Sequence, residues 1–319
     1  MCQQCKALLK AIDAYLAKAE DDLKKILESE GYTHAGDTMK YIDEIEEGVA
    51  GALTAETRLV QRALNRSKDI EEFERIWGDM KRKDHVDDEI AERVGDSFRR
   101  FMPKYTEYYL KMTDRALVFH RLSKRATDWM RSWAADLGDL MKLNSHGEIE
   151  RIYTQGLKEG IGIEEFSRRI LESGIRDERY KARRCAVTEV LTAHRAAQQE
   201  AFMQSPSVSK KRWMHTGDYR NQPRLNHVEM DGATVDKDSP FELLGADGEY
   251  YYPMYPGDTN LPAGERINCH CICQPIVDED VLGLPLEERE RMQREALDSM
   301  DDDWEAELDA RNRAKAGIE

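Results

Sequence analysis

Apolar residues in the first 145 positions recur with the three- and four-residue spacing of an α-helix. This spacing predicts helices over residues 6–28, 38–64 and 69–80. The second of these is the weakest, because Gly48 and Gly51 interrupt its pattern.

The longest periodic pattern runs from Val86 to Leu140. Its fifteen steps cover 54 residues, a mean spacing of 3.6 that matches a straight α-helix. Pro103 predicts a kink or a division of this helix near residue 102. The apolar face is interpreted as the surface that buries the N-terminal helices, with a partner-binding seam as the alternative. Asn144-Ser-His-Gly147 then predicts a break and a domain boundary.

The second half of the chain changes from helical to loop-rich. Helical spacing continues over 148–158, 163–171 and 179–203. Beyond residue 210 the helical period is lost, and turn-forming Gly, Pro and Asp residues become frequent. Short strands are expected at 211–214, 233–235 and 271–277.

These patterns predict an α+β protein that is predominantly α-helical. A long helical region is expected over 1–145, and a small, loop-rich α+β domain follows over 146–277. Residues 278–319 are expected to form an acidic helical tail.

The charge distribution places one basic segment inside an acidic chain. The net charge is −15, with 40% hydrophobic and 35% charged residues, and much of the acidity lies in the tail. Residues 179–224 carry ten basic and three acidic side chains. No run of about 18 apolar residues exists, so no membrane partner is expected.

The basic segment contains the candidates for contact with double-stranded DNA. Lys210, Lys211 and Arg212 form a cluster of positive charge, and Trp213 offers a ring for stacking. An ordinary exposed charged loop would have the same sequence, so both interpretations stay open.

Cysteines near the end of the loop-rich domain suggest a metal site. Cys269, Cys271 and Cys273 alternate, so an extended chain would point them to one face, and the preceding loop can bring in His227. Thiolates and imidazoles are the ligands that zinc prefers. One structural zinc ion and no other cofactor is therefore the hypothesis, and buried free thiols are the alternative.

Four further polar residues lie close together in the sequence or on the preceding helix: Glu189, Asp218, Arg220 and Arg224. They are interpreted as an internal network of salt bridges and hydrogen bonds that holds the loops together. The alternative is an enzyme, a nuclease or toxin-like domain that uses Asp218, Arg220 and His227.

The order of these motifs resembles the Mu F-like head morphogenesis family, the minor head proteins of tailed bacteriophages. The resemblance covers residues 175–277. It is carried by Ala186-Val-Thr188-Glu189, Trp213, Asp218-x-Arg220, Arg224-x-x-His227, Met230-Asp-Gly232, Phe241, Pro256-Gly-Asp258 and Asn268-Cys-His-Cys271. Members of the family usually have Arg between the two cysteines, where this chain has His270. Some relatives have cysteines near positions 224 and 227, which favours a metal site, but Arg224 cannot be its fourth ligand.

The resemblance implies a non-enzymatic minor capsid protein that acts in head assembly and in DNA packaging or ejection. Its expected partners are the portal protein and other head proteins, which the N-terminal helices would contact. Its expected location is the virion, inside the capsid near the portal, after assembly in the host cytoplasm.

Overall fold

The computed structural model describes residues 22–172, 178–216 and 223–301. The described residues divide into two compact units. The first unit lies within Met1–Ile42, Met102–Ser123 and Val190–Glu319, and the second comprises Asp43–Phe101 and Lys124–Glu189. Each unit is therefore built from segments that are distant in the sequence.

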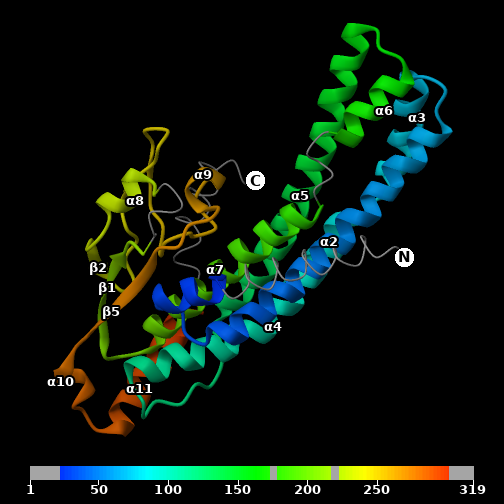
Figure 1. Cartoon of the computed structure of the whole chain (residues 1–319). Coiled ribbons are helices and arrows are strands. Elements are labelled where there is room, and N and C mark those ends of the chain that lie inside the picture. The colour runs from blue at the N-terminus through cyan, green and yellow to red at the C-terminus, as the bar shows by residue number, and fades with distance from the viewer. Residues whose placement is uncertain (1–21, 173–177, 217–222, 302–319) are drawn as a thin grey trace, which may run out of the picture. The chain divides into compact units, whose positions relative to one another are not determined.

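Most of the described chain is helical, and short strands follow the long helices (Figure 1). The elements are a helix over 22–29, α2 (Ala35–Arg66), α3 (Ile70–Lys81), α4 (Val86–Thr113), α5 (Lys124–Glu159), α6 (Ile163–Glu172), α7 (Glu178–Gln204), β1 (Val208–Met214), α8 (Leu225–Glu229), β2 (Thr234–Asp236), β3 (Leu243–Leu244), β4 (Tyr250–Tyr251), α9 (Ala263–Arg266), β5 (Ile272–Val277), α10 (Glu279–Leu282) and α11 (Leu286–Ser299). The predicted fold class, α+β and predominantly α-helical, is confirmed.

The second unit has an apolar core between helices. In Figure 1, α3 and α6 lie near the same end of α5. Phe73 of α3 meets Phe166 of α6 edge to face, with 4.9 Å between ring centroids. Asp69 caps α3, because its side chain accepts a hydrogen bond from the backbone N–H of Glu72. The core cluster is Val60, Ala63, Leu64, Ile70, Phe73, Trp77, Ile149, Ile152, Phe166 and Ile170.

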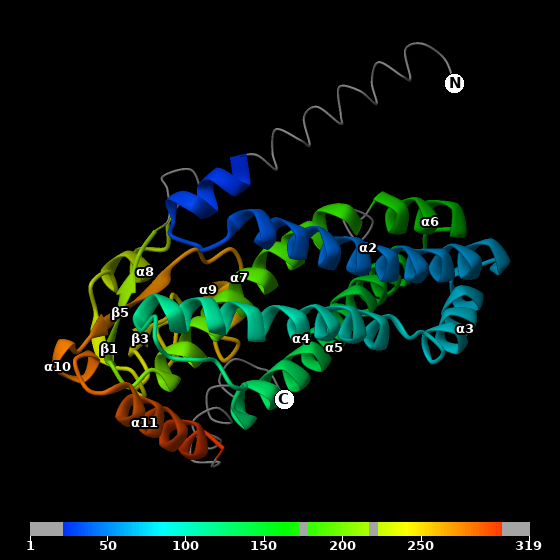
Figure 2. The same cartoon turned by 90° about the horizontal axis from the view of Figure 1, so that it is seen from below.

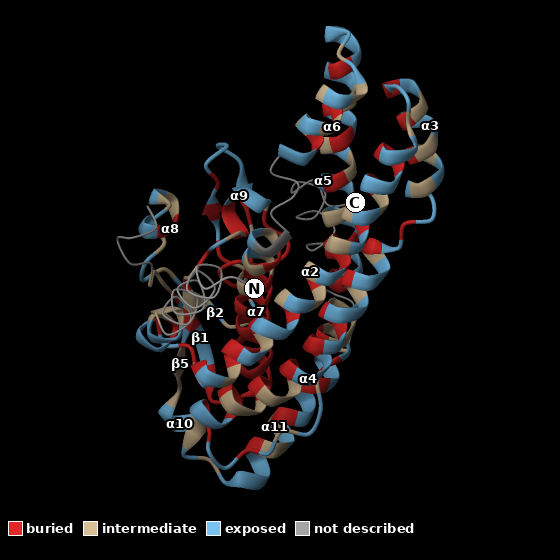
Figure 3. Cartoon of the chain, turned by 45° about the vertical axis from the view of Figure 1, so that its right-hand side comes forward, coloured by how far each residue is buried: buried red, intermediate tan, exposed pale blue. Residues whose placement is uncertain are grey.

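The first unit is arranged around the last part of α7. Every residue from 190 to 204 is buried, and this part of α7 is red in Figure 3. A three-stranded antiparallel sheet has the order β2-β1-β5, with Lys211 opposite both Val235 and Pro275. The helix α11, orange-red in Figure 2, adds Leu297 to a cluster with Met203 and Met300. The part of the predicted tail that the structure describes is therefore packed into this unit.

The long apolar pattern from Val86 to Leu140 belongs to two helices, so the prediction of one helix divided near residue 102 was wrong. α4 continues through Pro103 and ends at Thr113. A turn follows, in which the side chain of Asp114 accepts a hydrogen bond from the N–H of Ala116. Leu117 in this connection is buried while Ala116 is exposed, so the apolar spacing across the break does not mark one buried helical face.

The break predicted at Asn144–Gly147 was also wrong, because α5 runs through it without interruption. Ser145 and His146 are weak helix formers, but their side chains find partners in Glu56 and Asp84 of the same unit. Tertiary contacts thus outweigh local propensity here. Gly48 and Gly51 do not interrupt their helix either, since α2 is continuous through both.

No helix in the described ranges is both long enough and apolar enough to cross a membrane.

Replacing Gly138 of α5 by Ala is expected to destabilise the protein by about 1–3 kcal/mol through overpacking. A Cβ atom at this position would lie 2.4 Å from the carbonyl oxygen of Asp87. Gly147→Ala in the same helix is the matched control, because nothing lies within 4 Å of its added Cβ. It should stabilise the helix by about 0.5–1 kcal/mol. Chemical denaturation measures both, and equal effects would contradict the close approach at Gly138.

Candidate metal centre

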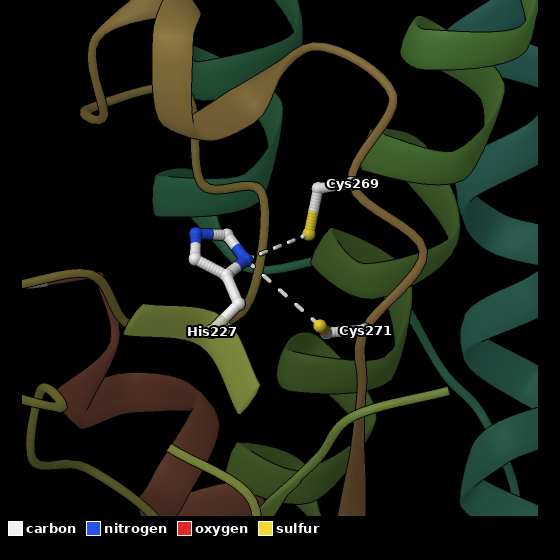
Figure 4. Close-up of side chains that lie close together, drawn as sticks. All are labelled: His227, Cys269 and Cys271. Carbon is white, nitrogen blue, oxygen red and sulfur yellow. Dashed lines mark hydrogen bonds between the residues drawn. The ribbon is translucent and has the colours of Figure 1, made fainter. Parts of the chain in front are cut away.

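Three of the four predicted ligands converge in the first unit (Figure 4). His227 lies on α8, while Cys269 and Cys271 precede β5. Nδ1 of His227 is 3.6 Å from Sγ of Cys269 and 3.9 Å from Sγ of Cys271. All three side chains are buried.

These separations match those of ligands around one zinc ion. With zinc–sulfur bonds near 2.3 Å and zinc–nitrogen bonds near 2.1 Å, tetrahedral geometry places nitrogen and sulfur ligands about 3.6 Å apart. The imidazole and the two thiols thus form a possible zinc site whose atoms already lie at ligand distances.

Glu265 on α9 holds the imidazole of His227 in the orientation that a metal needs. Nε2 of His227 is 3.0 Å from Oε2 of Glu265, which leaves Nδ1 facing the two sulfurs. The side chain of Asn226 and the N–H of Ala246 also donate to this carboxylate. Burial opposes the ionised form, but these hydrogen bonds lower the pKa of Glu265 to about 2. Metal-bound histidines typically have such a carboxylate partner, and sequence patterns did not indicate Glu265.

The backbone around the cysteines explains two of the sequence motifs. Asn268 has a φ of 57°, a left-handed conformation that Asn tolerates and that turns the chain directly before Cys269. Gly257 has a φ of 70°, and a Cβ there would lie only 2.1 Å from Nη1 of Arg195. The Pro256-Gly-Asp258 motif therefore makes room for a buried guanidinium beside the cysteines.

The two thiols differ in their electrostatic environment. The hydrogen bond from Cys271 lowers the pKa of Cys269 well below its usual value, and the nearby charges of Arg195 and His227 act in the same direction. Donating that hydrogen bond raises the pKa of Cys271, and burial adds to the increase. Burial acts to lower the pKa of His227, but hydrogen bonds to Cys269 and Glu265 raise it overall. Of the two thiols, Cys269 is thus the one whose ionised form its surroundings favour.

The sequence analysis did not associate two neighbouring residues, His215 and Trp213, with the metal centre. Nδ1 of His215 is 3.3 Å from Sγ of Cys271, although His215 is outside the group whose ligand atoms all lie within 4.8 Å. The ring of Trp213 packs edge to face on His227, with centroids 5.5 Å apart. Its buried N–H lies beside Cys271 and acts to lower the pKa of that thiol, against the stronger opposite effects of Cys269 and of burial.

Cys273 does not join the group, so this part of the predicted ligand set was wrong. β5 begins only at Ile272, and the expected alternation therefore does not extend back to Cys269 and Cys271. Burial raises the pKa of Cys273 to about 12, which keeps it a thiol.

Two of the four candidates for DNA contact are buried, so their predicted exposure was wrong. Nζ of Lys211 donates to the side chain of Gln199 and to the carbonyl oxygen of Met254. Trp213 faces the same way, because alternate residues of β1 point to one side of the sheet. Lys210 and Arg212 are exposed on the other side.

The predicted polar network is described only in part. Glu189 is buried and accepts a hydrogen bond of 2.7 Å from the indole N–H of Trp133. Arg224 donates to the carbonyl oxygens of Gly264 and Ile267, at 2.6 Å each. Asp218 and Arg220 lie outside the described residues. A joint network of the four residues therefore stays a prediction.

Comparison with known proteins places this site within a recognised family. The family model described as "Phage Mu protein F like protein" matches residues 147–274, a segment that includes all three converging ligands. The "Uncharacterized protein YqbB" of Bacillus subtilis (strain 168) is 32% identical over 303 residues, covering 92% of this chain and 98% of that protein. No solved structure matches the chain.

Proposed function

Because the chain belongs to the phage Mu protein F like family, we propose that it is a minor capsid protein of a tailed bacteriophage. Membership in the family suggests head morphogenesis. The finer proposal is that the protein acts at or near the portal vertex, during head assembly and DNA packaging or ejection. The observation that carries it is the family match over residues 147–274.

A structural rather than an enzymatic role fits the environment of His227. One ring nitrogen is held by Glu265 and the other faces Cys269 and Cys271. The side chain is only 2% exposed, so a substrate cannot reach it as a general base requires. The proposed location is the virion, inside the capsid near the portal, after assembly in the host cytoplasm. The proposed partners are the portal and other head proteins, contacted through helices before residue 145.

Deleting the coding sequence from the phage genome that carries it is expected to abolish infectious, DNA-filled particles. Plaque counts and electron microscopy of lysates measure the loss, and expression of the intact chain in trans should restore it. Mass spectrometry of purified restored virions should also detect the chain. Normal, infectious particles from the deletion strain would contradict the proposal.

We propose further that Lys210 and Arg212 contribute non-specific contact with double-stranded DNA. Both lie on the exposed side of β1. Lys210 is paired with Asp236 at 2.8 Å, but both side chains are more than half exposed. Such surface pairs contribute little stability, so a phosphate can replace the carboxylate.

The double substitution Lys210→Glu/Arg212→Glu should weaken binding of the purified chain to duplex DNA. Loss of two phosphate contacts is expected to reduce the slope of log affinity against log salt by about 2. Arg58→Glu/Arg62→Glu on α2 makes the same change in net charge at exposed positions and serves as the control. Equal binding by both variants would reject this contact surface.

We also propose that His227, Cys269 and Cys271 hold one structural zinc ion. The proposal is supported by the ligand distances, the carboxylate behind the imidazole and the lowered pKa of Cys269. A structural ion of this kind stabilises a small, turn-rich region that buries little apolar area. Zinc ligands must be deprotonated, so binding should weaken as the pH falls.

Cys269→Ser and Cys271→Ser should each lower the zinc content by about one ion per chain. Cys273→Ser is the matched control, because this buried thiol lies outside the ligand group and its loss should leave the zinc content unchanged. Elemental analysis of protein purified without chelator measures the zinc content.

Glu265→Gln should weaken zinc binding by roughly 10–100-fold, because the carboxylate that supports His227 is lost. If the wild-type chain contained no sulfur-bound zinc, the cysteines would be buried free thiols and the proposal would be rejected.

A further inference from the structure

A second cluster of possible metal ligands lies in the second unit. It consists of Glu56 on α2, Asp84 directly before α4, and His146 on α5. Nε2 of His146 is 3.1 Å from Oδ2 of Asp84 and 3.3 Å from Oε1 of Glu56. The side chains of Glu56 and Asp84 are each 4% exposed, and that of His146 is 16% exposed. Glu56 and Asp84 lie outside the segment that matches the family.

In each of the two carboxylates, Glu56 and Asp84, the oxygen that faces away from His146 accepts a hydrogen bond from a neutral donor. The hydroxyl of Ser145 donates to Oε2 of Glu56 at 2.7 Å, and the N–H of Val86 donates to Oδ1 of Asp84 at 3.1 Å. The inner oxygens, Oε1 of Glu56 and Oδ2 of Asp84, both face Nε2 of His146. The nearby ammonium of Lys142 donates to the backbone of Asp84 and to the side chain of Asp87, not to these inner oxygens.

A proton on His146 cannot satisfy both inner oxygens. Nε2 carries at most one hydrogen, and its hydrogen bond goes to Asp84. Oε1 of Glu56 is buried and has no hydrogen-bond partner among the described residues. A buried charged acceptor without a partner is costly. This oxygen contacts Nε2 of His146 as an ion pair at 3.3 Å but accepts no hydrogen bond from the described residues, and it therefore points to a ligand between the three side chains.

We propose that Oε1 of Glu56, Oδ2 of Asp84 and Nε2 of His146 bind a divalent transition-metal cation, with zinc as the best fit. Zinc–oxygen and zinc–nitrogen bonds of about 2.0–2.1 Å place tetrahedral ligands about 3.3 Å apart. The observed distances of 3.1 and 3.3 Å agree with this separation. One divalent ion also neutralises the two carboxylates, and it satisfies both inner oxygens at once.

The ion would link α2, the connection before α4, and α5. The ring of His146 also meets Trp77 of α3 edge to face, with 5.4 Å between centroids.

The test uses the full chain with Cys269→Ser/Cys271→Ser, which removes the sulfur ligands of the other centre. After treatment with chelator, titration with zinc chloride should show about one ion bound per chain. X-ray absorption of the zinc-loaded protein should show only oxygen and nitrogen ligands.

Adding Glu56→Gln to this background should weaken zinc binding at least tenfold, because a charged ligand is lost. Glu47→Gln, an exposed residue of the same helix, should leave binding unchanged. If the cysteine variant does not fold, the same comparison in the wild-type chain should show a loss of about one zinc ion with Glu56→Gln alone.

The proposal would be overturned if no zinc bound to oxygen and nitrogen ligands were found, or if Glu56→Gln left zinc binding unchanged. The cluster would then be a protonated imidazole between two carboxylates. Neither outcome bears on the proposed role in the phage head, since the argument uses only residues of the second unit.

Discussion

Burial of polar side chains along α7 is the constraint on which the first unit depends. Residues 190–204 are all buried, including His194, Arg195 and Glu200. Each buried polar group needs a partner, and distant segments supply them. Thr38 and Tyr109 bond to His194, while the N–H and hydroxyl of Ser123 donate to Glu200. Segments that are far apart in the sequence are therefore positioned by hydrogen bonds to one helix.

The same constraint connects α7 to the metal centre through Arg195. Its guanidinium donates to the hydroxyl of Tyr32 and to the carbonyl oxygen of Cys269. A buried positive charge favours an anion nearby, and it contributes to the lowered pKa of Cys269. Gly257 leaves the space that the guanidinium occupies. The lowered pKa of Cys269 therefore depends on packing around α7 as well as on the two neighbouring ligands.

Sequence patterns predicted the helices and strands that follow from hydrophobic periodicity. They failed for features that depend on tertiary contacts. The helices over 69–80, 163–171 and 179–203 were predicted within one or two residues of α3, α6 and α7, and three short strands were located. His227, Cys269 and Cys271 were selected because their side chains have zinc chemistry. Glu265, however, is an ordinary acidic residue in the sequence, and only the fold places it behind the imidazole.

The errors have a related physical cause. Lys211 was expected to be exposed because it lies in a basic run, but strand alternation turns it inward, where Gln199 and Met254 satisfy its ammonium. A helix break was predicted at Ser145 and His146 because local propensity takes no account of hydrogen-bond partners on other segments. This chain buries several of its charged side chains, and buried charges need specific partners. In both units the buried ionisable clusters join segments that are distant in the sequence, so the positions of these segments are coupled through specific polar partners.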